Sequence, residues 1–184
     1  MAEVSSFAIR DGVPADAPAL ARTHVEAWEA AYRGQVPDDA IAAMTVERRE
    51  EMWARHLAEP ARGTLVVEGG DRAVGFAMFG PAEDETLGPA TGEVYGIYLL
   101  PEAIGTGTGR DLFARVTDRL RAAGFTSAIL WVLETNDRAR RFYEAAGWRW
   151  DGTTSAHRFD CAERPIVRYT VRLSTSRVPS GEGP

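Results

Sequence analysis

The sequence predicts a mixed α/β fold, an α+β domain in which helices pack against one mixed sheet. Segments whose apolar residues recur at helical spacing alternate with short β-rich segments along most of the 184 residues. A glycine-rich turn also joins one strand to a helix, which is typical of a β-α-β crossover. We therefore expect one domain over residues 1–173, followed by a polar, Pro- and Gly-rich, frayed tail over 174–184.

The N-terminal part predicts one strand followed by two helices. Residues 7–10 form a short strand, and residues 14–32 form a helix that ends at a turn containing Gly and Pro. Large side chains recur at helical spacing within this helix, namely Leu20, His24 or Val25, Trp28 and Tyr32. Residues 45–57 form the second helix, with Thr45 as its N-cap.

Three strands are predicted in the middle of the chain. Residues 64–68 and 73–79 are rich in β-forming residues and flank the turn Gly69-Gly70-Asp71, so they form a hairpin. An acidic loop covers 81–92, and residues 93–100 form a strand with β-branched and aromatic side chains. The first part of the sheet is therefore expected to be largely antiparallel.

The C-terminal part predicts two helices and three more strands. An amphipathic helix covers 111–123, an apolar strand covers 127–133, and a second helix covers 136–146. Two strands, over 148–155 and 166–173, complete the order β-α-α-β-β-β-α-β-α-β-β.

The chain contains no lysine, because all 21 of its basic residues are arginine. P-loop nucleotidases, protein kinases, pyridoxal-phosphate enzymes and class A β-lactamases each depend on a particular lysine, so these classes are excluded. The single cysteine excludes an intramolecular disulfide and Cys-rich zinc sites.

The formal net charge is −6, which differs from the basic surface of a nucleic-acid-binding protein and suits cationic partners. No stretch is apolar for as long as a signal-peptide core or a membrane span requires. The three histidines show no metal-like spacing, so packing or surface roles are expected for them. We expect a cytoplasmic bacterial protein with no metal, no membrane association and no nucleic-acid partner.

The glycine-rich turn that precedes the helix at 111–123 is the strongest candidate for a ligand site. It consists of Ile104, Gly105, Thr106, Gly107, Thr108, Gly109 and Arg110. Alternate glycines let the backbone approach a ligand, and the following helix adds the positive end of its dipole, which together suit a pyrophosphate. A dinucleotide fingerprint would require glycine where Arg110 stands, and a glycine-rich turn without a ligand is the alternative.

Two motifs resemble those of the GNAT superfamily of N-acetyltransferases. The run EVYGIYLLPE over 93–102, followed by Ile104-x-x-Gly107-x-Gly109, is similar to the family's motif A. The run NDRARRFYEAAGW over 136–148 resembles motif B, N-x-x-A-x-x-F-Y-E-x-x-G-F. Ile104 replaces the usual Gln or Arg at the start of the loop, which removes one side-chain contact to the phosphates and leaves the main-chain cradle.

The resemblance implies a GNAT fold with a splayed central sheet and an acetyl-CoA-dependent N-acetyltransferase without a metal. In this family the pantetheine arm lies like an extra strand against the backbone that corresponds to Ile97, Tyr98 and Leu99. The other residues implied in cofactor binding are those of the glycine-rich turn and Asn136, Ala139, Phe142 and Tyr143. An alternative for Asn136 is that it caps the helix that follows it, and both roles are compatible.

Tyr143 and Glu93 are the catalytic residues that the resemblance implies. Tyr143 would protonate the leaving thiolate, and the alternative is a core aromatic with a satisfied hydroxyl. Glu93 would deprotonate the acceptor ammonium through water, and the alternative is an exposed carboxylate at a strand end. Strand alternation, in the absence of a bulge, places Glu93, Tyr95 and Ile97 on one face.

Trp28 and Tyr32 are implied as one wall of the acceptor site, with Glu93 and Tyr95, although Trp28 and Tyr32 also fit a core stripe. The acceptor would be a primary amine of a small molecule or a peptide, attacking directly in a ternary complex. An amino acid, a polyamine, an aminoglycoside-like compound and a peptide N-terminus all stay open. The alternative function is a catalytically weak CoA-binding sensor of the same fold, and a homodimer is compatible with the family.

Overall fold

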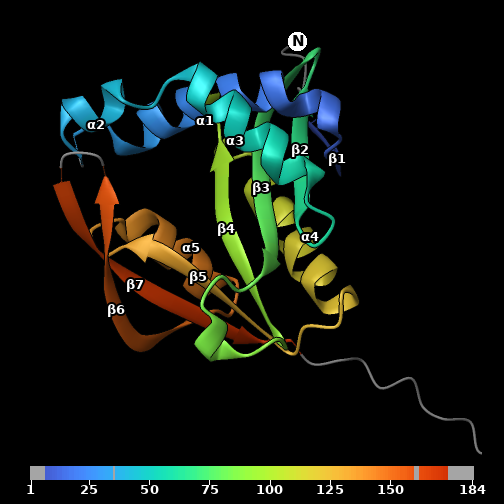
Figure 1. The fold of residues 1–184 in the computed structure, drawn as a ribbon, viewed down its shortest axis with the longest axis vertical. Helices are drawn as coiled ribbons and strands as arrows, with labels where there is room; N and C mark the ends of the chain where they lie inside the picture. Colours follow the sequence, from blue (N-terminus) through green and yellow to red (C-terminus); the bar gives the residue numbers. More distant parts are fainter. Residues whose placement is uncertain (1–6, 35, 160–161, 174–184) are drawn as a thin grey trace, which may run out of the picture.

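Seven strands form one sheet in the computed structural model, which describes residues 7–34, 36–159 and 162–173. The strands are β1 (Phe7–Asp11), β2 (Gly63–Gly69), β3 (Arg72–Pro81), β4 (Thr91–Leu99), β5 (Ser127–Leu133), β6 (Arg149–Phe159) and β7 (Ala162–Arg172). Their order across the sheet is β1-β2-β3-β4-β5-β7-β6 (Figure 1). The tail expected over 174–184 lies outside the described residues.

One parallel pair of strands interrupts an otherwise antiparallel sheet. β4 and β5 pair in parallel only from Thr91 opposite Ser127 to Val94 opposite Leu130. On its other side, β4 stays paired with β3 as far as Leu99. β4 and β5 therefore separate after Val94, and the central sheet is splayed, as expected from the family resemblance (Figure 1).

Five α-helices connect the strands within the described residues, together with short 3₁₀ turns. The helices are α1 (Ala17–Tyr32), α2 (Asp38–Ala42), α3 (Val46–Ala58), α4 (Thr108–Ala122) and α5 (Asp137–Ala145), and the 3₁₀ turns are Pro14–Asp16, Glu85–Leu87 and Pro101–Ala103. The predicted order of elements is confirmed, and the Thr45 hydroxyl caps α3 by accepting the Arg48 N–H at 3.4 Å. The sequence pattern does not predict α2, because five residues with one buried side chain, Ala40, show no apolar period. None of the described helices has both the length and the apolar character needed to cross a bilayer.

Helices cover both faces of the sheet around its centre. α1 and α3 pack on one face, where Leu20 and Trp53 meet Phe76 of β3 in a buried cluster. α4 packs on the other face, where Leu112 and Val116 are buried in a second cluster with strand residues. Burial of each large apolar side chain contributes roughly 1.5–3 kcal/mol. The two clusters therefore stabilise the central strands from both faces of the sheet.

A β-bulge in β4 changes which face its side chains occupy. Phe79 of β3 lies opposite Val94, whereas the preceding Met78 lies opposite Gly96, so Tyr95 is the extra residue. Tyr95 packs with the cluster beneath α1 and α3, and Ile97 packs with the cluster beneath α4. The prediction that Glu93, Tyr95 and Ile97 share one face is therefore wrong for Ile97, because the bulge shifts the alternation by one residue.

Candidate active site

A cleft of about 940 Å³ lies where β4 and β5 separate. One wall is β4 from Tyr95 to Leu99, and the other includes β5 from Trp131 to Leu133. Since β4 is paired only with β3 along this stretch, its edge toward β5 has main-chain N–H and C=O groups that no strand of the sheet uses. An extended ligand can add to such an edge in the manner of a further strand.

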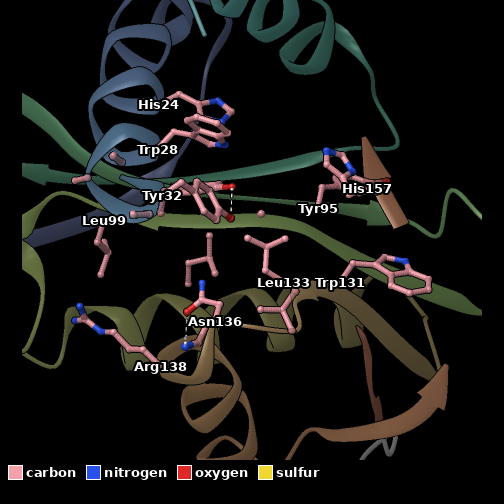
Figure 2. A pocket seen from close by; sticks show the side chains of 18 of the residues that line it. His24, Trp28, Tyr32, Tyr95, Leu99, Trp131, Leu133, Asn136, Arg138 and His157 are labelled. Atoms are coloured by element: carbon pink, nitrogen blue, oxygen red, sulfur yellow. Dashed lines mark hydrogen bonds between the residues drawn. The ribbon is translucent and has the colours of Figure 1, made fainter. Parts of the chain in front are cut away.

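Most of the residues predicted for the site line this cleft. They are Trp28, Tyr32, Tyr95, Ile97, Tyr98, Leu99, Ile104, Gly109, Asn136, Ala139, Phe142 and Tyr143. Figure 2 shows Trp28 and Tyr32 projecting from α1 on one side of the cleft, with Leu133 and Asn136 on the opposite side. The other predicted residues are outside this lining, namely Glu93, Gly105, Thr106, Gly107, Thr108 and Arg110.

The glycine-rich turn borders the cleft, because Ile104 and Gly109, on either side of its centre, line it. Gly105 and Gly107 have φ angles of +83° and +94°, and nothing lies within 4 Å of where a Cβ would stand on either residue. Within the described residues the N–H groups of Gly105, Thr106 and Gly107 donate to no backbone carbonyl. With the N-terminus of α4 beginning at Thr108, these donors form a cradle that suits a phosphate group.

Asn136 caps α5 and also lines the cleft, so its place is compatible with both of the roles expected for it. Its Oδ1 accepts the Ala139 N–H at 3.1 Å, which caps α5, and the residue also lines the cleft. Figure 2 shows the amide nitrogen directed toward the cleft, on the side of Leu133. Arg138, on the first turn of α5, lines the cleft as well and extends beside Leu99 (Figure 2).

Tyr143 is held by the core and still reaches the cleft. It is 8% exposed, and its ring lies 5.3 Å from the Phe113 ring and 6.1 Å from the Tyr169 ring. Burial raises the pKa of Tyr143 well above the ordinary tyrosine value. The hydroxyl is therefore protonated at neutral pH and can act as a donor to a group in the cleft.

Glu93 is buried on β4, beyond the end of the cleft. It is 8% exposed, and its carboxylate accepts the Glu83 N–H at 2.9 Å. Burial raises the pKa of Glu93, while the Glu83 N–H and the Arg62 charge oppose that rise. The alternative of an exposed strand-end carboxylate is therefore wrong. Tyr95, two residues after Glu93 on β4, is the first residue of this strand that lines the cleft. Its hydroxyl donates to the Pro81 carbonyl at 2.5 Å.

An aromatic wall closes the cleft on the side of α1. The Trp28 and Tyr32 rings lie 4.9 Å apart, and the Tyr32 and Tyr98 hydroxyls share a hydrogen bond of 3.3 Å. Trp28 is also part of a buried cluster with Val36 and Ala40, so it packs in the core as well as lining the cleft.

Several lining residues are not predicted as site residues by the sequence. They are His24 on α1, Arg49 on α3, Trp131 on β5, and His157 and Arg158 on β6. His24 precedes Trp28 by one helical turn, so the helical stripe contains the signal that could have found it. His157 and Tyr95 line the same cleft, although the two residues are far apart in the sequence. No local pattern in the sequence brings β6 to that place.

This arrangement defines a class of protein before any relative is considered. A strand edge open to an extended ligand, a turn with free main-chain N–H groups and a buried tyrosine donor form a site that suits an extended ligand with a phosphate group. Residues 24–148 match the family model described as "Acetyltransferase (GNAT) family". The chain belongs to this family.

The chain is similar to two N-acetyltransferase relatives in sequence and to one solved N-acetyltransferase in structure. An uncharacterized N-acetyltransferase, YuaI, from Bacillus subtilis is 33% identical over 138 residues, which cover 74% of this chain and 77% of the relative. A mycothiol acetyltransferase from Beutenbergia cavernae is 38% identical over 110 residues, which cover 58% of this chain and 34% of the relative. The PaiA N-acetyltransferase from Thermoplasma acidophilum, solved in complex with coenzyme A, has the same fold. It superposes with a TM-score of 0.70 at 18% identity, covering 91% of this chain and 99% of that one.

Proposed function

We propose that this chain transfers the acetyl group of acetyl-CoA to a primary amine of a small molecule or peptide, by direct attack in a ternary complex. The observation that carries the proposal is the unpaired edge of β4 from Tyr95 to Leu99, which shares one cleft with the buried hydroxyl of Tyr143. The solved relative with coenzyme A supports the donor, and the mycothiol acetyltransferase supports a small-molecule acceptor.

The residues present fit acetyl-CoA as the donor. The main-chain donors of Gly105 to Gly107 and the N-terminus of α4 suit its pyrophosphate, and the β4 edge suits its amide-containing arm. Ile104 is 36% exposed and lines the cleft, and its side chain offers no hydrogen bond, so main-chain groups would carry the phosphate contact there. The donor supplies an activated acetyl carbon when it is bound. Free N–H groups of the β4 edge would polarise the carbonyl oxygen of that acetyl group.

Tyr143 is the proposed general acid. The amine nitrogen forms a bond to the acetyl carbon, the carbon–sulfur bond breaks, and the Tyr143 hydroxyl gives its proton to the leaving sulfur. The raised pKa of Tyr143 keeps that proton in place until sulfur begins to carry negative charge. Tyr143 then regains a proton from solvent or from the displaced amine proton, so the cycle closes without a net change.

Glu93 is the proposed general base, acting through water. Because Glu93 does not line the cleft, a water chain past Tyr95 has to connect its carboxylate with the acceptor nitrogen. Burial raises the pKa of Glu93, which makes its carboxylate a better proton acceptor than an exposed one. The proton lost by the ammonium thus passes to Glu93 and from there to solvent, which regenerates the carboxylate.

Two measurements test the function together. Calorimetric titration is expected to show acetyl-CoA binding, and release of free thiol is expected to depend on addition of an amine from a panel. Binding without thiol release for any amine would support the CoA-binding sensor instead. Absence of acetyl-CoA binding would remove the acetyltransferase proposal.

A further inference from the structure

We propose that the end of the cleft between α1 and α3 binds a carboxylate of the acceptor through Arg49 and His24, so that the acceptor is an amine that also carries a carboxylate, as an amino acid does. This inference rests on the proposed acetyl transfer to an amine. It narrows the acceptor class that the sequence leaves open.

The charge of the cleft lining is the first support. Among the described residues that line the cleft, every formally charged side chain is an arginine, namely Arg49, Arg138 and Arg158. No aspartate or glutamate is among these lining residues, although the whole chain has 27 acidic residues and a net charge of −6. Figure 2 shows Arg138 and Leu99 toward the same end of the cleft, away from Tyr95. A polyamine would meet like charge here, whereas an anionic group would be attracted.

A buried polar atom near Arg49 is the second support. His24 lines the cleft and is 5% exposed, and its Nδ1 has no hydrogen-bond partner among the described residues. The Trp53 ring lies 6.0 Å from the His24 ring, and the Trp53 indole N–H is likewise buried without such a partner. Leaving a buried polar group unsatisfied is costly, so the Nδ1 atom of His24, which lines the cleft, indicates a polar ligand group there, whereas Trp53 itself does not line the cleft.

The chemistry of these groups favours an acceptor of hydrogen bonds. The Arg49 guanidinium can only donate, and a neutral imidazole can donate through Nδ1 in one tautomer. Burial and, to a smaller extent, the positive charge of the nearby Arg49 lower the pKa of His24 to about 3. The imidazole is therefore neutral at neutral pH. Arg49 and Trp53 are four residues apart on α3 and therefore lie on one face of that helix. A carboxylate offers two oxygens to such donors, and guanidinium–carboxylate pairing is the strongest of these contacts.

The carboxylate site is close to the reacting strand. The Tyr98 ring lies 5.3 Å from the His24 ring, and the Tyr98 hydroxyl lies 3.3 Å from the Tyr32 hydroxyl. The backbone of Tyr98 belongs to the open edge of β4. Only the width of this one side chain therefore separates the carboxylate site from the strand edge, which suits an amine and a carboxylate joined by a few bonds.

The test compares matched acceptors in steady-state thiol release. The panel contains amino acids, their amides and the corresponding decarboxylated amines, each with wild type, Arg49→Met, Arg49→Lys and His24→Phe. Wild type is expected to favour the carboxylate form in kcat/KM by about 10- to 100-fold, the range for a charge-assisted hydrogen bond. Arg49→Met is expected to lose this preference, His24→Phe to reduce it, and Arg49→Lys to keep part of it, with acetyl-CoA affinity unchanged in calorimetry. Arg48→Met is the matched control, since Arg48 is adjacent in the sequence and does not line the cleft.

Equal losses for the carboxylate form and its amide in Arg49→Met would overturn the inference, because a structural role affects both acceptors alike. A preference of wild type for decarboxylated amines would overturn it as well. If no amine is acetylated, the proposed function fails, and titration of the amino acids into the protein with coenzyme A then decides the inference alone. Binding that Arg49→Met abolishes would support the carboxylate site, and no binding to wild type would exclude it.

Discussion

The hydroxyl oxygen of Tyr32 on α1 lies 3.3 Å from the hydroxyl oxygen of Tyr98 on β4, and the two groups share a hydrogen bond. Tyr98 contributes its backbone to the open edge of β4, and Tyr32 belongs to the aromatic wall beside Trp28. The bond therefore joins the wall proposed for the acceptor directly to the strand proposed for the donor. We therefore expect a change at this pair to affect the binding of both substrates, the acceptor more than the donor.

Tyr32→Phe removes the hydroxyl that pairs with Tyr98. We expect a destabilisation of about 1 kcal/mol, because the buried Tyr98 hydroxyl loses its partner. The KM of the acceptor is expected to rise, while acetyl-CoA affinity changes little, because the wall shifts and the phosphate cradle does not. Steady-state kinetics with both substrates and thermal unfolding check this. A larger effect on acetyl-CoA than on the acceptor would contradict the assignment of Tyr32 to the acceptor wall.

Tyr143→Phe tests the general acid. We expect kcat to fall by about 100- to 10,000-fold, the range for loss of a positioned acid, with acetyl-CoA affinity nearly unchanged. Tyr169→Phe is the matched control, because Tyr169 is also a buried tyrosine whose hydroxyl bonds Glu144 at 2.6 Å and does not line the cleft. An unchanged kcat in Tyr143→Phe, under conditions where chemistry limits the rate, would remove Tyr143 from this role.

Glu93→Gln tests the general base through its pH profile. The rate is expected to be reduced at neutral pH and to recover toward wild type as the acceptor amine deprotonates on its own at higher pH. In wild type the rate is expected to fall as the pH drops through the raised pKa of Glu93, since the base is then protonated. Glu85→Gln, at an exposed position of the preceding loop, serves as the control. A loss that is constant across pH would argue against a base role.

The same substitution has a separate effect on stability. Burial holds the pKa of Glu93 above its ordinary value in the folded chain, so the folded state binds this proton more tightly than the unfolded state does. Folding stability from this group is therefore present at acidic pH and declines as the pH rises through the raised pKa. We expect Glu93→Gln to be at least as stable as wild type at neutral pH, since a glutamine oxygen can still accept the Glu83 N–H. Thermal unfolding at acidic and neutral pH measures the difference, and a clear loss of stability at neutral pH would contradict this sign.

Gly107→Ala tests the phosphate cradle. Gly107 has a φ of +94°, which an alanine adopts only with strain of about 1 kcal/mol or more, and relief of that strain would turn the N–H groups of the loop. We expect a loss of acetyl-CoA affinity together with a modest loss of stability. Gly124→Ala is a close control, because Gly124 also has a φ of +94° with open space around it and lies at the other end of α4. Equal effects of the two variants on acetyl-CoA affinity would show that the cradle is not the binding element.

The sequence predicts the fold well because long elements have periods that are visible locally. Thr45 as a cap and the alternation of strands and helices depend on neighbours within a few residues. The bulge at Tyr95 depends instead on how β3 and β4 pair, and a single extra residue in a strand leaves no mark on its own sequence. Because of this extra residue at position 95, Ile97 lies on the face opposite to the one that simple alternation predicts.

The sequence predicts the site residues that belong to a short motif, and it misses those that only the packing of distant elements brings to the cleft. Gly107, Asn136 and Tyr143 belong to short motifs with recognisable spacing. Arg49 and His157 come from elements that are distant in sequence, and their presence in one cleft follows from packing of α3 and β6 around the splay. Charges on such residues cannot be assigned to a site until the three-dimensional arrangement is known.

Only four residue pairs, from Thr91 with Ser127 to Val94 with Leu130, join the two halves of the described sheet. The half that ends with β4 supports the aromatic wall and the donor's strand edge, while the chain that continues from β5 supports Tyr143. Because this pairing is short, we expect its local twist to influence how far Tyr143 lies from the open edge of β4. Natural variation at these pairs would tune the reach of the enzyme for acceptors of different size without altering any residue that touches them.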